Sequence, residues 1–246
     1  VRGLDDFIVK VHSELGLEIY LQTNGFFLIR MLPKIAPHLH TISLSLEGSN
    51  AEVNAFRRGP MAFDKVMNCL AYLDEHHPGI KVKIGTCVFK QNIADMPKMG
   101  EVLLERGFGK RFPDLGVWKL YQVTRFGAGK ADALLDSMLL TDEEFQSMST
   151  LLKHKFAEKI NVTTIATKDM GGYCIIVRPD GKVVSNAHSD NGEETIVFGD
   201  IFNDLKGGVD AIIKFQDAEH IKDRLEKTYF FEWEKPSNAQ KAVAVA

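Results

Sequence analysis

The stretch Ile80-Lys-Val-Lys-Ile-Gly-Thr-Cys-Val88 alternates apolar side chains with polar or small ones, which is the period-two pattern of a β-strand. The same alternation occurs before this stretch, in Leu17–Thr23 and Thr41–Leu46, and after it, in Val117–Val123. Helical patterns separate these segments, and the clearest one opens at Gly59-Pro60, with the proline suited to a first turn. Its apolar stripe is Phe63, Val66, Met67, Leu70 and Leu73. Strands that alternate with helices predict repeated βα units and a parallel sheet.

Each predicted strand has one apolar face and one polar face. Parallel strands that are covered by helices on both faces are nearly continuous apolar runs, and these strands are not. If the apolar faces pack under the helices, the polar faces line a shared interior that water or a polar ligand must fill. We therefore expect a curved or barrel-like sheet with a hydrated interior, and a half-exposed open sheet is the alternative. The polar set is Glu18, Tyr20, Gln22, Asn24, Ser43, Ser45, Glu47, Lys81, Lys83, Gly85, Cys87, Lys119 and Tyr121.

The composition is that of an ordinary folded chain of 246 residues, with 45% apolar and 26% charged residues. The 30 basic and 33 acidic residues give a net charge of −3, so no overall field favours a nucleic-acid polymer or an anionic membrane as partner. No apolar run approaches the roughly 20 residues that cross a bilayer, and no basic start followed by an apolar stretch suggests an export signal. These features predict a cytoplasmic protein.

Three cysteines, Cys69, Cys87 and Cys174, are too far apart for a close-spaced metal motif. Their odd number also argues against a secreted disulfide framework, so we expect reduced and mostly buried thiols. His188, Asp190 and Glu193 match no known metal-ligand spacing, and no metal site is assigned to them.

The rhythm of the sequence changes after about residue 125. Thr141 and Glu144 form a capping box, and Tyr173–Val184 has two β-rich arms around Pro179-Asp180-Gly181, which predicts a hairpin. We expect a barrel part at 1–130, a helix and hairpin extension at 131–235 that includes helices near 202–213 and 218–227, and a flexible tail at 236–246. Because a helical pattern at Leu4–Leu15 precedes the first strand and the chain starts at Val1, we also expect a piece of a longer protein.

Five short segments follow one another along the first half of the chain. They are Thr23-Asn24-Gly25, Ser43-Leu-Ser-Leu-Glu-Gly48, Asn54-Ala-Phe-Arg-Arg-Gly59, Lys83-Ile-Gly-Thr-Cys-Val-Phe-Lys-Gln-Asn92 and Trp118-Lys-Leu-Tyr-Gln122. In order and spacing they resemble the radical S-adenosylmethionine (radical SAM) superfamily. Glu52-Val53-Asn54 and Trp118-Lys119 to Gln122 resemble its viperin-like subgroup in particular. The match covers residues 1 to 125 and, more weakly, the rest.

The resemblance implies an α/β fold, a partial (β/α)6, TIM-barrel-like barrel that here lacks its first strands and carries a C-terminal α+β extension. It implies an enzyme that binds S-adenosylmethionine and cleaves it reductively to a 5'-deoxyadenosyl radical, which abstracts hydrogen from a small molecule or nucleotide. The family's [4Fe-4S] cluster is held by a CxxxCxxC loop and reduced by a donor such as flavodoxin or ferredoxin. That loop is absent from this sequence, so the chain alone is expected to be inactive.

Cofactor-binding residues follow from the resemblance and from strand periodicity. Ser45 lies where the family contacts the ribose or methionine part of the cofactor, and Asn24 closes a turn from which it either contacts the ligand or holds the loop. Lys83 is placed to meet a carboxylate or phosphate, and Tyr121 faces the interior. Thr86 is a further candidate. Gly85 departs from the viperin-like subgroup, which has a polar residue there.

Arginines after the strand ends are the candidates for substrate binding. Arg57, Arg58 and Arg125 lie in loops at the carboxyl ends of the strands, where parallel barrels build their sites. A guanidinium fork suits a phosphate, so Arg58 and Arg125 are assigned to a nucleotide substrate. Asn92 is interpreted as a helix cap, with Asp95 three residues on.

Two other classes of function stay open. One is a non-catalytic relative that keeps the barrel as a binding or interaction module. The other is an aldolase-like barrel that uses Lys83 or Lys119 as a Schiff-base nucleophile.

Overall fold

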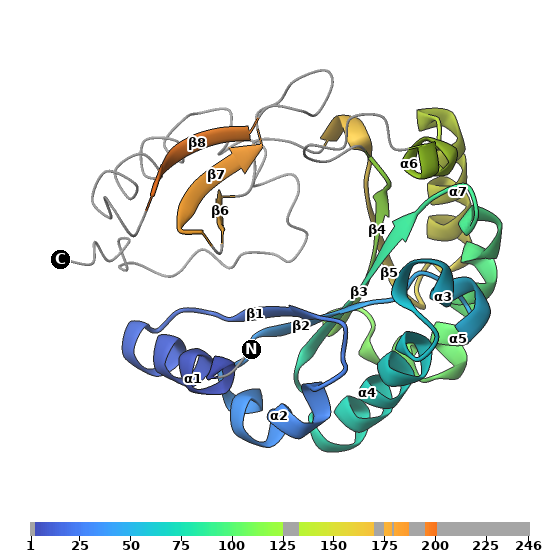
Figure 1. Ribbon diagram of the computed structural model, residues 1–246. Helices are drawn as coiled ribbons and strands as arrows, with labels where there is room; N and C mark the ends of the chain where they lie inside the picture. Colours follow the sequence, from blue (N-terminus) through green and yellow to red (C-terminus); the bar gives the residue numbers. More distant parts are fainter. Residues whose placement is uncertain (1–2, 125–132, 170–174, 179, 187–194, 201–246) are drawn as a thin grey trace. The chain divides into compact units, whose positions relative to one another are not determined.

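Five parallel strands form the main sheet of the protein, in the order β1-β2-β3-β4-β5 (Figure 1). The structure is a computed structural model that describes residues 3–124, 133–169, 175–178, 180–186 and 195–200. The sheet lies in the first of two compact units, which comprises residues 1–124 and 130–169. Its strands are β1 (Tyr20–Thr23), β2 (Thr41–Ser45), β3 (Lys81–Val88), β4 (Gly116–Gln122) and β5 (Asn161–Ile165).

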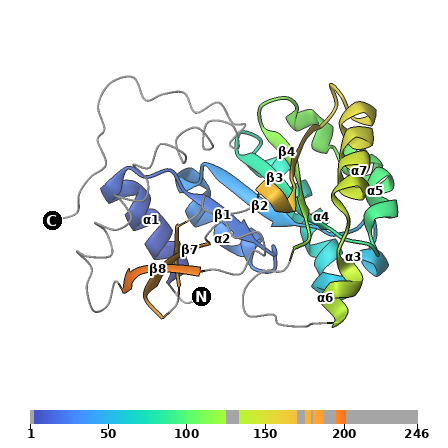
Figure 2. The same cartoon turned by 90° about the horizontal axis from the view of Figure 1, so that it is seen from above.

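Helices connect each strand to the next, as parallel pairing requires. Figures 1 and 2 show α3, α4, α5 and α7 along one face of the sheet. The helices are α1 (Leu4–Leu15), α2 (Leu28–Ile35), α3 (Ala51–Arg58), α4 (Ala62–His76), α5 (Met96–Glu105), α6 (Ala133–Met138) and α7 (Asp142–Lys155), and the short 3-10 turns are η1 (Ala36–His38), η2 (Ile93–Asp95), η3 (Phe108–Arg111) and η4 (Thr167–Asp169). This is the α/β architecture of a partial barrel, and no closed barrel forms among the described strands.

The two faces of the sheet differ as the alternation predicts. On β3 every second side chain, from Val82 to Val88, is buried under the helices, while the residues between them are only half-buried. On β4, Trp118 and Leu120 are buried and Lys119 and Tyr121 are half-buried. The apolar stripe predicted after Gly59 is the buried face of α4. The side of the sheet with the half-buried residues of β3 and β4 also carries the buried Ser43 and Ser45 of β2, and we call it the polar face.

Several boundaries differ from the sequence analysis. Pro60 lies outside any helix, because Gly59 ends α3 with a positive φ of 82° and α4 begins only at Ala62. The sheet also extends past residue 130, since β5 pairs in parallel with β4. The alternation in Asn161-Val-Thr-Thr-Ile165 is too weak for the sequence pattern to reveal this strand.

The second unit contains a three-stranded antiparallel sheet of β6 (Ile175–Val177), β7 (Lys182–Asn186) and β8 (Thr195–Asp200). The hairpin predicted around Asp180-Gly181 is therefore confirmed. The helices expected near 202–213 and 218–227, the tail at 236–246, Cys174, Arg125, His188, Asp190 and Glu193 lie outside the described residues. Among the helices that the structure describes, none combines the length and hydropathy of a bilayer span.

Candidate functional site

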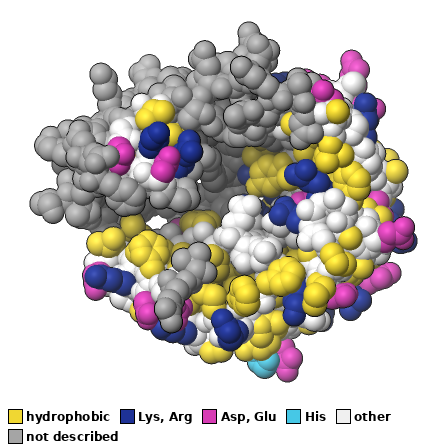
Figure 3. Space-filling model, viewed as in Figure 1, with side chains coloured by type: hydrophobic (Ala, Val, Ile, Leu, Met, Phe, Trp, Pro, Cys, Tyr) yellow, Lys and Arg dark blue, Asp and Glu magenta, His cyan; other side chains and the backbone are white. Residues whose placement is uncertain are grey.

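The polar face gathers hydroxyl and ammonium groups from three neighbouring strands. Register places Ser43 beside Lys83, Ser45 beside Gly85, and Gly85 beside Lys119. Since side chains in register on parallel strands point to the same side, these groups share one surface. In Figure 3, dark blue Lys or Arg side chains lie over β3 and β4.

Tyr121 connects the basic groups on this face. The Lys83 ammonium donates to the Tyr121 hydroxyl over 3.4 Å, and Lys119 Nζ lies 5.7 Å from the centre of the Tyr121 ring. Gly85 leaves room beside that ring, because a Cβ added there would be 3.6 Å from Tyr121 Cε2. Two cations, a phenol and neighbouring hydroxyls form a donor set that suits an anionic oxygen ligand.

Two serines of the polar face are almost completely buried. Ser43 and Ser45 are only 6% and 7% exposed, and within the described part of the chain neither side chain has a hydrogen-bond partner. Neither hydroxyl oxygen is among the fully buried atoms that lack a partner, so both reach the surface of the polar face, where they can bond water or a ligand.

The structure separates Thr86 from these residues. Thr86 is fully buried on the helix-covered side of β3, where its hydroxyl donates to Leu46 O (2.7 Å) and accepts from Trp118 Nε1 (3.0 Å). Contrary to the expectation, it is unavailable to a ligand on the polar face. Asn24 is exposed and its carboxamide oxygen accepts the Phe26 N–H over 3.2 Å, which is the turn-holding role.

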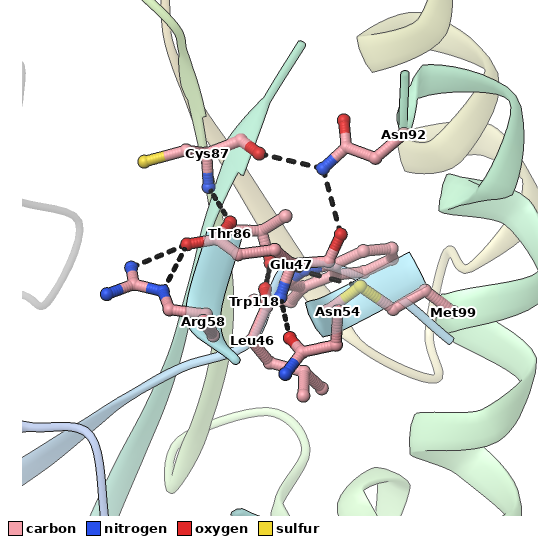
Figure 4. A network of polar contacts seen from close by, with 9 residues as sticks. All are labelled: Leu46, Glu47, Asn54, Arg58, Thr86, Cys87, Asn92, Met99 and Trp118. Atoms are coloured by element: carbon pink, nitrogen blue, oxygen red, sulfur yellow. Dashed lines mark hydrogen bonds and ion pairs between the residues drawn. The ribbon is translucent and has the colours of Figure 1, made fainter. Parts of the chain in front are cut away.

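Arg58 has an internal partner that the sequence did not suggest, the carboxylate of Glu47. Both Arg58 Nε and Nη2 donate to Glu47 Oε1, at 2.9 and 2.5 Å. The other oxygen, Oε2, accepts the backbone N–H of Cys87 over 2.6 Å. Glu47 is only 1% exposed, and burial raises the pKa of its carboxyl against the opposing effect of Arg58. Figure 4 shows this network.

Two buried amides hold the backbone of Glu47. Asn54 Oδ1 accepts its N–H at 2.8 Å, and Asn92 Nδ2 donates to its C=O at 2.9 Å. Asn92 also donates to Cys87 O and accepts from Phe89 N. It occupies the N-cap position of η2, as expected, but its side chain makes no capping hydrogen bond. The Asn92 side chain thus connects the segment after β2 to the end of β3, and the 3-10 turn η2 lies between Asn92 and α5.

The described cysteines do not form a metal centre. Cys69 lies buried in α4, where its thiol donates to Gly25 O over 3.3 Å, and Cys87 lies on the polar face. Burial raises the pKa of each thiol to about 11. Among the described residues, no three His, Cys, Asp or Glu side chains are grouped to hold a metal ion. These residues therefore do not fit an iron-sulfur cluster.

A comparison with solved structures found fold similarities at low sequence identity. One is the crystal structure of a radical SAM methyltransferase from Sphaerobacter thermophilus, with 17% identity, a TM-score of 0.46, and coverage of 63% of this chain and 44% of that one. Another is Streptococcus suis SuiB bound to the precursor peptide SuiA, with 13% identity, a TM-score of 0.45, and coverage of 66% and 35%. The chain thus spans less than half the length of either. No protein-family model and no curated protein matches it.

Proposed function

We propose that this chain is the barrel part of a radical SAM enzyme, and that its polar face binds S-adenosylmethionine together with an anionic substrate. The observation that supports this most is the pair of nearly buried serines, Ser43 and Ser45, whose accessible hydroxyls have no partner among the described residues and lie beside the Lys83–Tyr121 contact. The five segments that resemble the superfamily add to it. A hydroxyl both donates and accepts, as ribose hydroxyls and a carboxylate require.

Each group has a role in the proposed complex. Ser45 contacts the ribose or methionine part of S-adenosylmethionine, whereas Lys83, Lys119 and Tyr121 hold a phosphate or carboxylate of the substrate. Nucleotides of the kind used by viperin-like enzymes carry such a group. The cofactor supplies the radical that abstracts hydrogen, and the protein positions it. The cluster ligands and the electron donor come from outside this sequence.

Isothermal titration tests the proposal with S-adenosylmethionine and with inorganic triphosphate as separate probes. Ser45→Ala should weaken S-adenosylmethionine binding about tenfold, and Lys83→Met should weaken triphosphate binding by a similar factor, because a charge-assisted hydrogen bond contributes about 1.5–3 kcal/mol. The matched control is Lys98→Met, which removes an exposed lysine on α5. Wild-type protein that binds neither probe would refute the proposal.

A non-catalytic binding module is the second candidate, because the described cysteines do not supply cluster ligands. The two candidates differ in the longer protein. An enzyme reconstituted anaerobically with iron and sulfide, together with the CxxxCxxC segment, should form 5'-deoxyadenosine. A module should bind its ligand and form none.

A further inference from the structure

Glu47 lies at the point where two strands and two helical segments meet. It lies two residues after the end of β2 at Ser45, and its carboxylate contacts Arg58 at the end of α3 and the backbone of Cys87 on β3. Both carboxylate oxygens accept strong hydrogen bonds, as a buried charge requires. Glu47 thus links the end of α3 to β3.

The contact leaves one edge of Arg58 available. Nε and Nη2 both donate to the same Glu47 oxygen, while Nη1 has no partner among the described residues. The Arg58 side chain is 33% exposed. In Figure 4 it extends to the same side of β3 as the Cys87 thiol, which is the side of the polar face. A guanidinium held by one carboxylate in this way still has donors for a second anion.

The loop after β2 does not need the carboxylate to hold its backbone. Asn54 and Asn92 already bond the N–H and C=O of Glu47, and Asp95 bonds both the N–H and the hydroxyl of Ser49. Burial raises the pKa of the Glu47 carboxyl because it disfavours the charged form. The cost of desolvation offsets much of the attraction to Arg58, so the ion pair is expected to add little to the stability of the fold. Perturbed groups of this kind occur most often at functional sites.

We propose that Glu47 is a positioning residue, which fixes the Arg58 guanidinium so that its Nη1 edge faces an anionic group of the ligand bound at the polar face. The presence of that ligand rests on the proposed function. The fixed orientation of Arg58 does not. Glu47→Gln tests the orientation, because a carboxamide can offer its oxygen to Arg58 or to the Cys87 N–H but not to both.

Two measurements on the full chain decide the matter. The first is hydrogen exchange of the Arg58 Nε–H by NMR, which should accelerate at least about tenfold in Glu47→Gln, accelerate by a smaller factor in Glu47→Asp, which keeps the charge but moves it away from Arg58, and stay unchanged in Asp95→Asn. The Asp95 variant is the matched control, because it weakens the other side-chain contact of the same loop without touching Arg58.

The second measurement is a double-mutant cycle on the binding of inorganic triphosphate. Glu47→Gln should raise the Kd about tenfold, yet it should have no further effect in an Arg58→Ala background, because Glu47 acts through Arg58. Equal effects in both backgrounds, or an unchanged Nε–H exchange rate, would overturn the inference. If the wild type bound neither triphosphate nor S-adenosylmethionine, the proposed function would fail, and the exchange rates would still decide the role of Glu47.

Glu47→Gln could also unfold the chain, so circular dichroism melting accompanies both measurements. If it unfolds, Glu47→Asp serves in its place, because a side chain shorter by one methylene keeps the charge and moves it away from Arg58. Faster Arg58 exchange in a folded Glu47→Asp protein would then support the inference, and an unchanged rate would overturn it.

Discussion

Cys87 shows how the buried charge of Glu47 affects its neighbour. Burial, and then the Glu47 carboxylate, raise the pKa of the Cys87 thiol to about 11. At pH 8 only about one thiol in a thousand is therefore the reactive thiolate. We expect iodoacetamide to modify Cys87 very slowly at that pH and faster as the pH rises towards 11. In Glu47→Gln the rate at pH 8 should increase several-fold, because the repelling charge is gone.

Peptide mass spectrometry separates this effect from a general loosening of the fold. Cys69 has the same raised pKa of about 11, but Glu47 is not among its causes, so its modification rate is the internal control. A Cys87 rate that stays constant in Glu47→Gln would contradict the prediction. Equal acceleration of Cys69 would show that the variant had opened the core instead.

At the residue scale the sequence predicts the polar face better than it predicts the contacts made there. Alternation alone places Ser45, Lys83 and Tyr121 on one side of the sheet. It cannot show that Glu47 pairs with Arg58, 11 residues later, or meets Cys87, 40 residues later, because the fold creates both contacts. The same alternation places Thr86 on the apolar side of β3, where the structure has it, whereas the resemblance to the family suggested a cofactor-binding residue.

At the scale of elements, local signals were reliable where one hydrogen-bond pattern dominates. The capping box of Thr141 and Glu144 is present, with both reciprocal bonds formed. Asn92 is a residue type that often caps helices, yet its side chain donates instead to the backbone carbonyls of Glu47 and Cys87. Such competition between local and tertiary partners leaves no trace in a single sequence.

Gly100 determines how closely α5 can approach its neighbours. A Cβ at this position would overlap the Phe156 ring and lie 2.9 Å from Trp118 Cζ3, and both rings are buried. We expect Gly100→Ala to lower the free energy of unfolding by about 1–3 kcal/mol in a urea titration, because neither aromatic ring can move without disturbing the core.

Gly79→Ala is the matched control, because an added Cβ there meets nothing within 4 Å and the backbone is not in the left-handed region. That variant should stay within about 0.5 kcal/mol of the wild type. If both variants lost the same stability, the packing explanation for Gly100 would be wrong.

At the scale of the whole molecule, the main sheet has a hydrophobic core of its own. Every buried residue of its largest described core cluster lies between Ile8 and Val162, and these residues come from the strands, their helices and the adjoining turns and loops. The candidate site also lies within this range, because Ser43, Glu47, Lys83 and Tyr121 all belong to the first unit. A unit with its own core generally folds as a cooperative body.

We therefore predict that a chain ending at Asp169 keeps the first unit folded. It should melt cooperatively by circular dichroism, and its β3 and β4 amides should retain slow hydrogen exchange, because both strands have hydrogen-bonded neighbours on each side. The control is the same chain shortened to Thr124, which lacks α7 and β5 and so exposes the Trp118 face and one edge of β4. If the Asp169 chain exchanged as rapidly as the Thr124 chain, the core described here would depend on residues beyond 169.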